Sequence, residues 1–165
     1  MPQDILFKTD DYVFSYRVAG ILIKDNCVLL QKPPDDPGYA FPGGHVTLGE
    51  TNAQTLAREF REEIGAQINV NALAWVGELF FPWGTRRCHQ ICLYYYVTLS
   101  DETSIPLSGS FHGMETLESE VSRMDFVWVR LEQLAEVELY PEQAKAFFKR
   151  GSRDVEYFIY RESEN

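Results

Sequence analysis

Residues 44–66 read GHVTLGETNAQTLAREFREEIGA, and this segment has the clearest structural pattern in the chain. From about Asn52 to Ile64, apolar residues recur at helical spacing and fall within one arc of the helix. These residues are Ala53, Leu56, Ala57, Phe60 and Ile64. Gly65 follows at the position where a glycine commonly ends a helix. The segment therefore predicts an amphipathic helix over residues 52–64, with one face buried.

The same helix carries three carboxylates, Glu59, Glu62 and Glu63, within an arc of about 100° beside the apolar face. Glu50 precedes the helix and is placed to reach back toward them. Like charges at this spacing, and acids near a helix C-terminus, destabilise the helix. A bound divalent cation would relieve both penalties, and all-oxygen ligands favour Mg²⁺ or Mn²⁺ over zinc. The alternative is a solvated acidic face, stabilised by the neighbouring arginines.

The flanking sequence predicts more strands than helices. We expect strands over residues 14–23, 27–30, 68–81, 88–99, 126–129 and 155–160. We expect a tight hairpin at residues 24–26, a turn at residues 82–84, a helical turn at 131–135 and a helix over 141–149. Residues 100–124 are polar and glycine-containing and predict a long loop. The chain is therefore expected to be a single α+β domain over residues 1–165, with a mixed sheet packed against helices.

Composition limits the function. The chain has 165 residues and a net charge of −10, which argues against binding to long nucleic acids, because that binding needs clustered cations. Cys27, Cys88 and Cys92 lack metal-site spacing and predict free thiols in a reducing compartment. The acidic N-terminus does not resemble a signal peptide, and no apolar stretch is long enough to span a membrane. We therefore expect a cytoplasmic protein without a membrane segment.

The spacing from Gly44 through Glu50, Arg58-Glu59-Phe60 and Glu62-Glu63 to Gly65-Ala66 resembles the complete Nudix box. The preceding YAFPGG, residues 39–44, is similar to the usual lead-in of that family. Phe60 and Ala66 differ from the aliphatic residues that the family prefers, but both are apolar. The resemblance implies a Nudix α/β/α sandwich with a mixed sheet over roughly residues 14–150.

The resemblance also implies hydrolysis of a nucleoside diphosphate linked to another moiety, X. It assigns Glu59, Glu62 and Glu63 as ligands of Mg²⁺, with Mn²⁺ as the alternative. Glu50 would be a further or water-mediated ligand, and Gly44 would let the backbone approach the metal closely. Arg58 resembles the arginine that orients a ligating glutamate.

The general base stays open at this level. A carboxylate not fully engaged with metal is suited to take the proton from the attacking water. Glu62 and Glu63 are candidates, and in some members of the family the base comes from the long loop. There, Glu120 is the first choice and Glu118 the second. The residues alone do not separate these four.

Substrate contacts are predicted less specifically. Pro82 lies at a spacing from the box that resembles the mark of members cleaving ADP-ribose, although a turn proline between two strands is the favoured explanation. Phe81 and Trp83 are suited to stack a base or to fill the core. Basic candidates for contacting the substrate are Arg17, Lys32 and Arg87, each of which would otherwise face solvent.

The expected reaction is metal-dependent hydrolysis of ADP-ribose, a nucleotide sugar or a nucleoside triphosphate. The alternative is a non-catalytic Nudix-fold module that senses a nucleotide. The complete set of box glutamates in this chain argues against it, because a non-catalytic module would be free to lose one of them. An RNA-decapping enzyme is disfavoured by the charge of −10. The resemblance also allows a homodimer by analogy with small members of the family.

Overall fold

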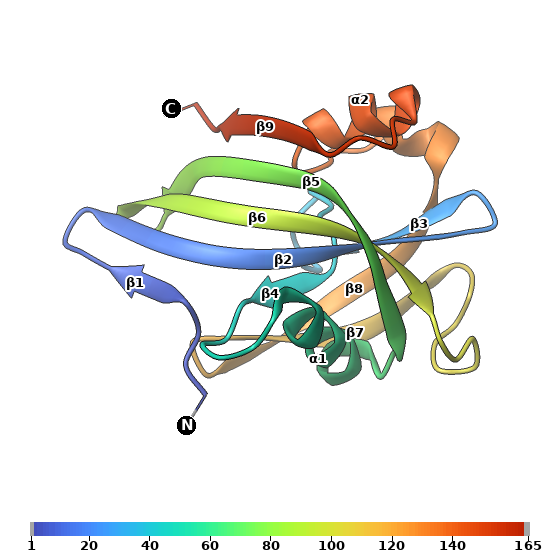
Figure 1. Ribbon diagram of the computed structural model, residues 1–165, viewed down its shortest axis with the longest axis horizontal. Helices are drawn as coiled ribbons and strands as arrows, with labels where there is room; N and C mark the ends of the chain where they lie inside the picture. Colours follow the sequence, from blue (N-terminus) through green and yellow to red (C-terminus); the bar gives the residue numbers. More distant parts are fainter. Residues whose placement is uncertain (1, 164–165) are drawn as a thin grey trace.

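In the computed structural model, which describes residues 2–163, nine strands form a mixed sheet (Figure 1). The strand order is β7-β8-β3-β2-β6-β5-β9, with β1 and β4 also paired to β2. The strands are β1 Leu6–Lys8, β2 Tyr12–Lys24, β3 Cys27–Lys32, β4 Gly43–His45, β5 Ile68–Trp83, β6 Arg86–Leu99, β7 Ser110–Leu117, β8 Glu120–Arg130 and β9 Glu156–Arg161. The predicted α+β class and mixed sheet are confirmed.

Strand β2 connects the parts of the sheet. It runs parallel to β6 and antiparallel to β3, and the β2–β3 turn places Asp25 and Asn26 at φ of 49° and 62°. Positive φ at both turn residues is typical of a tight hairpin whose twist matches its strands. Arg17, Val18 and Ala19 of β2 also pair with β4, so the lead-in of the box lies directly beside β2.

Helix α1 spans Asn52–Ile64, as the apolar spacing predicts. Its start is fixed by a capping box, in which the side chains of Thr51 and Gln54 each accept a backbone N–H of the other residue. Its end is fixed by Gly65 at φ 71°, a left-handed conformation that glycine adopts without a steric penalty. Ala53 was expected on the buried face but is exposed, because the first turn extends beyond the sheet-facing residues Leu56 and Phe60.

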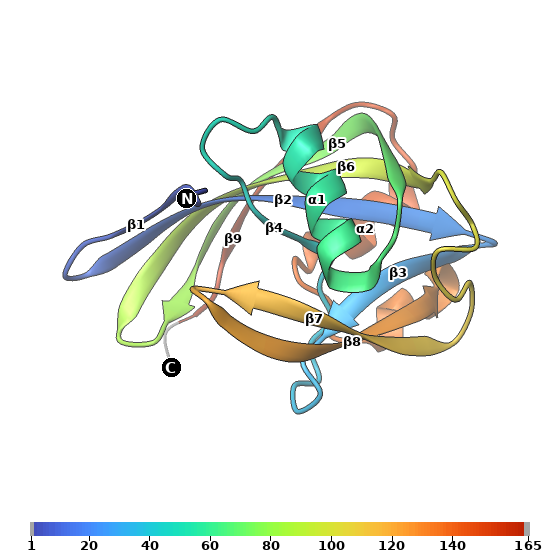
Figure 2. The same cartoon turned by 90° about the horizontal axis from the view of Figure 1, so that it is seen from below.

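Two hydrophobic clusters flank the sheet. One contains Leu56 and Phe60 of α1, and the other contains Phe147 of helix α2 (Gln143–Arg150) together with Leu134 of the 3₁₀ helix η1 (Leu131–Glu136). Figure 1 shows α1 and α2 on opposite sides of the strands, and Figure 2 shows α1 crossing β2 beside β7. This arrangement matches the expected sandwich.

The prediction of a loop over residues 100–124 is wrong for its second half. Residues 110–130 form the antiparallel β7–β8 hairpin, whose turn is Glu118-Ser119. The segment is polar because much of β7 and the start of β8 face solvent, so its composition hides a strand. The short strand expected over residues 126–129 is the buried end of β8.

Two element boundaries also differ from the prediction. β5 continues through Pro82 to Trp83, and the chain turns at Gly84 instead. Proline is tolerated there because the pairing of β5 with β9 ends at Phe80, which leaves this part of β5 with one partner strand. Helix α2 begins at Gln143 and not at the predicted proline.

No helix within residues 2–163 combines the length and apolarity that crossing a membrane requires.

Candidate active site

Helix α1 presents its carboxylates at three different depths. Glu63 is buried, with 7% of its surface exposed. The side chain of Glu59 is 16% exposed, and that of Glu62 is 57% exposed. The three carboxylates therefore lie beside the apolar face as predicted. Their exposure increases from Glu63 through Glu59 to Glu62.

Arg58 lies at the centre of this cluster. Its Nε donates to Glu50 Oε1 at 3.0 Å, and its Nη1 donates to Glu59 Oε1 at 2.9 Å and Glu62 Oε2 at 3.1 Å. Nη2 donates to Thr47 Oγ1 at 3.0 Å. One guanidinium therefore orients three of the four box carboxylates, because its donors have a fixed planar geometry.

Gly44 is required by the packing of Glu59. A Cβ atom added at position 44 would lie 2.3 Å from Glu59 Cδ and 2.6 Å from Glu59 Oε2. These separations are far below van der Waals contact, so the carboxylate occupies the space that any other side chain would fill. The structure thus gives Gly44 a packing role beside Glu59, and its predicted approach to a metal stays a prediction.

Burial sets the electrostatics of the inner carboxylates. Desolvation, together with the Glu59 carboxylate, raises the pKa of Glu63 to about 9, although Arg17 lowers it. Desolvation also raises the pKa of Glu59, against the effect of Arg58. By contrast, hydrogen bonds from Arg58 lower the pKa of Glu50. Two adjacent buried carboxylates therefore share an environment in which ionising both is unfavourable without an added cation.

The donor set fits a divalent cation. Glu63 Oε2 is buried and has no hydrogen-bond partner among residues 2–163. A cation beside Glu59 and Glu63 would satisfy this oxygen and neutralise the pair, and carboxylate oxygens are ligands that Mg²⁺ and Mn²⁺ accept. Within the described residues, no three His, Cys, Asp or Glu side chains are already gathered around one metal position, and Arg58 holds Glu50 and Glu62 instead. Metal ligation by these residues stays a prediction.

The β7–β8 hairpin brings Glu115 to the site. A Cβ at Gly113 would lie 2.6 Å from the Glu63 carbonyl oxygen, so β7 packs tightly on the last turn of α1. Glu115 is two residues further along β7 and shares the same face of the strand. It lies within electrostatic reach of both Glu63 and Arg17. Sequence reasoning missed Glu115 because it treated this segment as a loop; the signal was the alternation of Phe111, Gly113 and Glu115.

The two glutamates predicted from this segment lie at the hairpin turn. Glu118 forms an ion pair with Lys8 at 2.5 Å, and Glu120 is exposed opposite Leu117. Neither lines the cavity beside the box, whereas Glu115 does. The prediction of Glu120 as the base is therefore not supported by its position.

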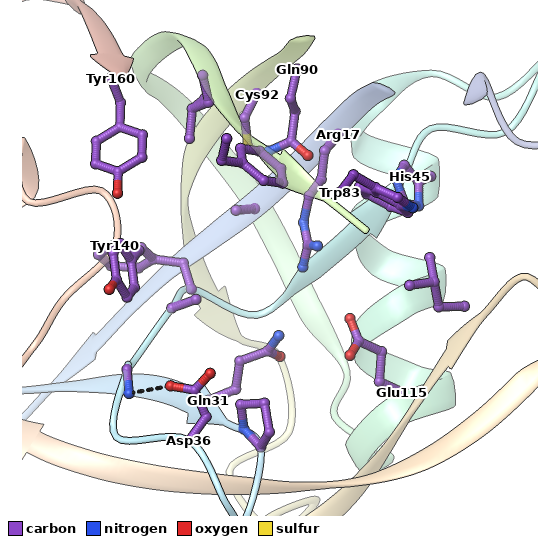
Figure 3. Close-up of a pocket in the computed structure, with 18 of the residues that line it drawn as sticks. Arg17, Gln31, Asp36, His45, Trp83, Gln90, Cys92, Glu115, Tyr140 and Tyr160 are labelled. Carbon is purple, nitrogen blue, oxygen red and sulfur yellow. Dashed lines mark hydrogen bonds between the residues drawn. The ribbon is translucent and has the colours of Figure 1, made fainter. Parts of the chain in front are cut away.

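A cavity of about 430 Å³ lies over the sheet beside the box (Figure 3). Arg17, Phe81 and Trp83 line it, so the structure brings together three of the five predicted substrate contacts. Arg17 lies centrally, and its Nη2 donates to the Gly43 carbonyl at 3.4 Å. Burial lowers the pKa of Arg17, but Glu115, Cys92 and Glu63 together raise it above its usual value, so the guanidinium is charged.

The other two predicted contacts do not line this cavity. The Lys32 ammonium donates to the carbonyls of Pro33 and Asp36 and holds that loop. Arg87 lines a separate cavity of about 320 Å³ with Arg86 and Arg161. His45, which is not among the predicted site residues, also lines the main cavity, and its buried Nε2 has no hydrogen-bond partner among residues 2–163. Burial and Arg17 lower the pKa of His45 to about 4, which keeps its imidazole neutral.

Comparison with known proteins identifies the family of the chain. Residues 14–150 match the family model described as the NUDIX domain. An ADP-ribose pyrophosphatase from Methanocaldococcus jannaschii is 42% identical over 62 residues, which cover 36% of this chain and 37% of that protein. The nucleoside triphosphatase NudI of Salmonella paratyphi B is 27% identical over 136 residues, covering 72% of this chain and 83% of that protein.

Among solved structures, the chain resembles a MutT protein from Bacillus halodurans, with a TM-score of 0.62 and 19% identity over 90% of each chain. At this identity the likeness shows the shared fold.

Proposed function

Because the chain belongs to the Nudix hydrolase family, we propose that it hydrolyses the pyrophosphate bond of a small nucleoside diphosphate derivative with the help of Mg²⁺ or Mn²⁺. The observation that carries this proposal is the buried Glu59–Glu63 pair, with its unpartnered Glu63 oxygen next to the cavity residues Arg17 and Glu115. ADP-ribose, nucleotide sugars and nucleoside triphosphates are the candidate substrates. The names of the two relatives cover the first and last of these classes.

The residues of α1 would hold the cation. Glu59 and Glu63 would be its inner ligands, the exposed Glu62 would close the site, and Glu50 would act directly or through water. A divalent ion bound there supplies charge neutralisation for the phosphates and acidifies a water molecule. Arg58 holds Glu59 and Glu62 close to the site, and the exposed Glu62 would turn from Arg58 toward the ion when it binds.

Arg17 is suited to contact a phosphate oxygen. It is a charged guanidinium inside the cavity, and an arginine can donate two parallel hydrogen bonds to a phosphate. Its position between the box and the rest of the cavity supports binding of the scissile pyrophosphate near α1. We infer that Arg17 and the cation divide the neutralisation of the substrate between them.

Three carboxylates remain candidates for the general base: Glu62, Glu63 and Glu115. Glu115 replaces Glu120 as the contribution of the β7–β8 hairpin, because it lines the cavity and faces Glu63 and Arg17. A base must lie within hydrogen-bond reach of the water that it deprotonates. Glu115 lines the cavity without being one of the glutamates assigned to the metal, so it would be free to take a proton from a water bound there.

The direct test is hydrolysis by the purified full chain of ADP-ribose, nucleotide sugars and nucleoside triphosphates, in Mg²⁺ and in EDTA. We expect cleavage of at least one class, complete loss in EDTA, and recovery with Mg²⁺ or Mn²⁺. Glu59→Gln should lower kcat at least about a hundredfold with an unchanged circular dichroism spectrum. The matched control Glu102→Gln removes an exposed carboxylate paired with Lys24 and should leave kcat unchanged. Binding without cleavage would instead favour a nucleotide-sensing module.

A further inference from the structure

The centre of the cavity presents hydrogen-bond donors from three neighbouring strands. Gln31 lies on β3, Arg17 on β2 and Gln90 on β6, and these strands are consecutive in the sheet order. All three side chains line the cavity, and Figure 3 shows the Arg17 guanidinium between the amides of Gln90 and Gln31. We call these three residues the donor triad.

Ser15 fixes the orientation of Gln90. The two residues are direct partners in the β2–β6 pairing, where Ser15 is fully buried and Gln90 is 7% exposed. The Ser15 hydroxyl donates to Gln90 Oε1 at 3.1 Å, so the amide oxygen is held against β2. Gln90 Nε2 has no hydrogen-bond partner within residues 2–163 and is not enclosed, so it is the end of the amide that opens to the cavity.

Gln31 presents the same end of its amide. The residue is 4% exposed, and its backbone N–H and carbonyl both pair with Ala40 at 2.8 Å. Its Oε1 is enclosed and unpaired among the described residues, whereas its Nε2 is open to the cavity. Buried polar groups that the protein leaves unpaired usually meet a ligand or an ordered water. Both glutamines therefore offer amide donors to the molecule that occupies the cavity.

The donor triad suits a group that only accepts hydrogen bonds. A guanidinium and two amide nitrogens supply donors, and the guanidinium of Arg17 is charged. A ribose hydroxyl brings a proton that the triad cannot accept, whereas the oxygens of an ionised phosphate only accept. A tetrahedral phosphate also directs its oxygens in several directions, as donors on three strands require, whereas the two oxygens of a carboxylate lie in one plane.

From these contacts we propose that Gln31 and Gln90 bind a phosphate of the substrate together with Arg17, and that Ser15 is a positioning residue that acts through Gln90. The inference rests on the proposed function, because it places this phosphate next to the one that the cation would hold. The Glu115 carboxylate also lines the cavity, and the proposed cation would offset its repulsion of the phosphate.

The test uses a probe that cannot be hydrolysed. Methylenediphosphonate has a carbon bridge in place of the bridging oxygen of pyrophosphate, and malonate carries two carboxylates on the same bridge. Their dissociation constants are measured by titration calorimetry on the full chain, in Mg²⁺ and in EDTA. We expect the diphosphonate to bind at least about tenfold more tightly than malonate.

Substitutions of the two glutamines identify the donors. Gln31→Met and Gln90→Met keep the length of the side chain without its donor, and each should raise the Kd of the diphosphonate about tenfold, the effect of one hydrogen bond to a charged group. Gln90→Glu keeps an oxygen for Ser15 but turns a second carboxylate oxygen toward the phosphate, so it should weaken binding further. The matched control Gln133→Met, at an exposed position of η1 that does not line the cavity, should keep the native Kd.

A double-mutant cycle tests Ser15. Ser15→Ala removes the hydroxyl that orients Gln90 and should raise the Kd about threefold. In the Gln90→Met background, the same substitution should change the Kd no further, because Ser15 acts through Gln90. Equal effects in the two backgrounds would overturn this role of Ser15.

A native Kd in both Gln31→Met and Gln90→Met, with unchanged circular dichroism, would overturn the donor triad. So would equal binding of malonate and the diphosphonate, or no measurable binding of the diphosphonate to the native chain. Binding that depends on the triad but not on Mg²⁺, in a chain that cleaves no substrate, would leave the triad standing without the proposed function. Hydrolysis that neither methionine variant affects would leave the reaction standing without the triad.

Discussion

At the candidate site, burial and ion pairing change the pKa values of individual carboxylates in opposite directions. Glu59 and Glu63 lie in positions where burial raises both pKa values, while Arg58 holds the more exposed Glu50 and lowers its pKa. Ionisation of both Glu59 and Glu63 is therefore unfavourable in the metal-free protein, and a bound cation would make it favourable. This contrast between inner and outer carboxylates yields two predictions.

The first concerns Glu63 and pH. Its folded pKa of about 9 lies above the value in the unfolded chain, so its contribution to stability is complete below about pH 4.5 and is lost as pH rises toward 9. In EDTA, Glu63→Gln should therefore be more stable than the native chain at pH 8 and equally stable at pH 4. Urea denaturation at the two pH values measures this. An equal difference at both would show that Glu63 ionises normally.

The second concerns Gly44. Gly44→Ala places a methyl group 2.3 Å from the position of Glu59 Cδ, so the carboxylate must move. We expect a kcat at least about tenfold lower and a lower melting temperature. Adding Glu59→Asp, which shortens the side chain, should recover the melting temperature but not kcat. A fully active Gly44→Ala would mean that Glu59 does not need this position.

At the level of elements, α1 and the β7–β8 hairpin bring the site together. The helix is fixed at both ends, by the Thr51–Gln54 capping box and by Gly65, and its last turn packs against β7 at Gly113. The helix was predictable because its apolar spacing, its cap and its glycine all point to the same limits. The hairpin was not, because its strand-forming residues are interrupted by polar and glycine positions and its stability comes from pairing with distant β3.

Loss of the α1 cap should lower the free energy of unfolding more than it lowers the activity. Thr51→Ala removes the side chain that accepts the Gln54 N–H and should lower the free energy of unfolding by about 1 kcal/mol. Chemical denaturation measures this value, and Thr85→Ala, at an exposed turn position outside any helix, serves as the comparison. No change in Thr51→Ala would show that packing alone fixes the start of α1.

The hairpin supplies a test of the general base. Glu115→Gln should lower kcat about a hundredfold and remove one limb of the pH–rate profile, if this carboxylate takes the proton. Glu120→Gln, measured in the same assay, tests the assignment suggested by the sequence. A larger effect at Glu120 than at Glu115 would contradict the assignment of Glu115 as the base.

Across the whole molecule, charge and fold act together. The net charge of −10 argues against a broad nucleic-acid surface, yet part of that charge is the proposed cation site on α1. The sequence predicted the box carboxylates and three cavity residues, Arg17, Phe81 and Trp83, because each lies on or beside an element with a clear pattern. It could not predict Gln31, Asp36, Tyr140 and Tyr160 as one group, because only the folded sheet brings these separate segments around one cavity.

The most direct test of the proposed cation site is the ratio of kcat/KM between the native chain and Glu63→Gln at saturating Mg²⁺, on the best substrate from the hydrolysis panel. We predict a fall of at least about a hundredfold, with unchanged circular dichroism, because the substitution removes the buried carboxylate that we assign to the cation with little change in side-chain volume. A folded Glu63→Gln that cleaves the substrate at the native rate would contradict the assignment of this buried pair to the cation.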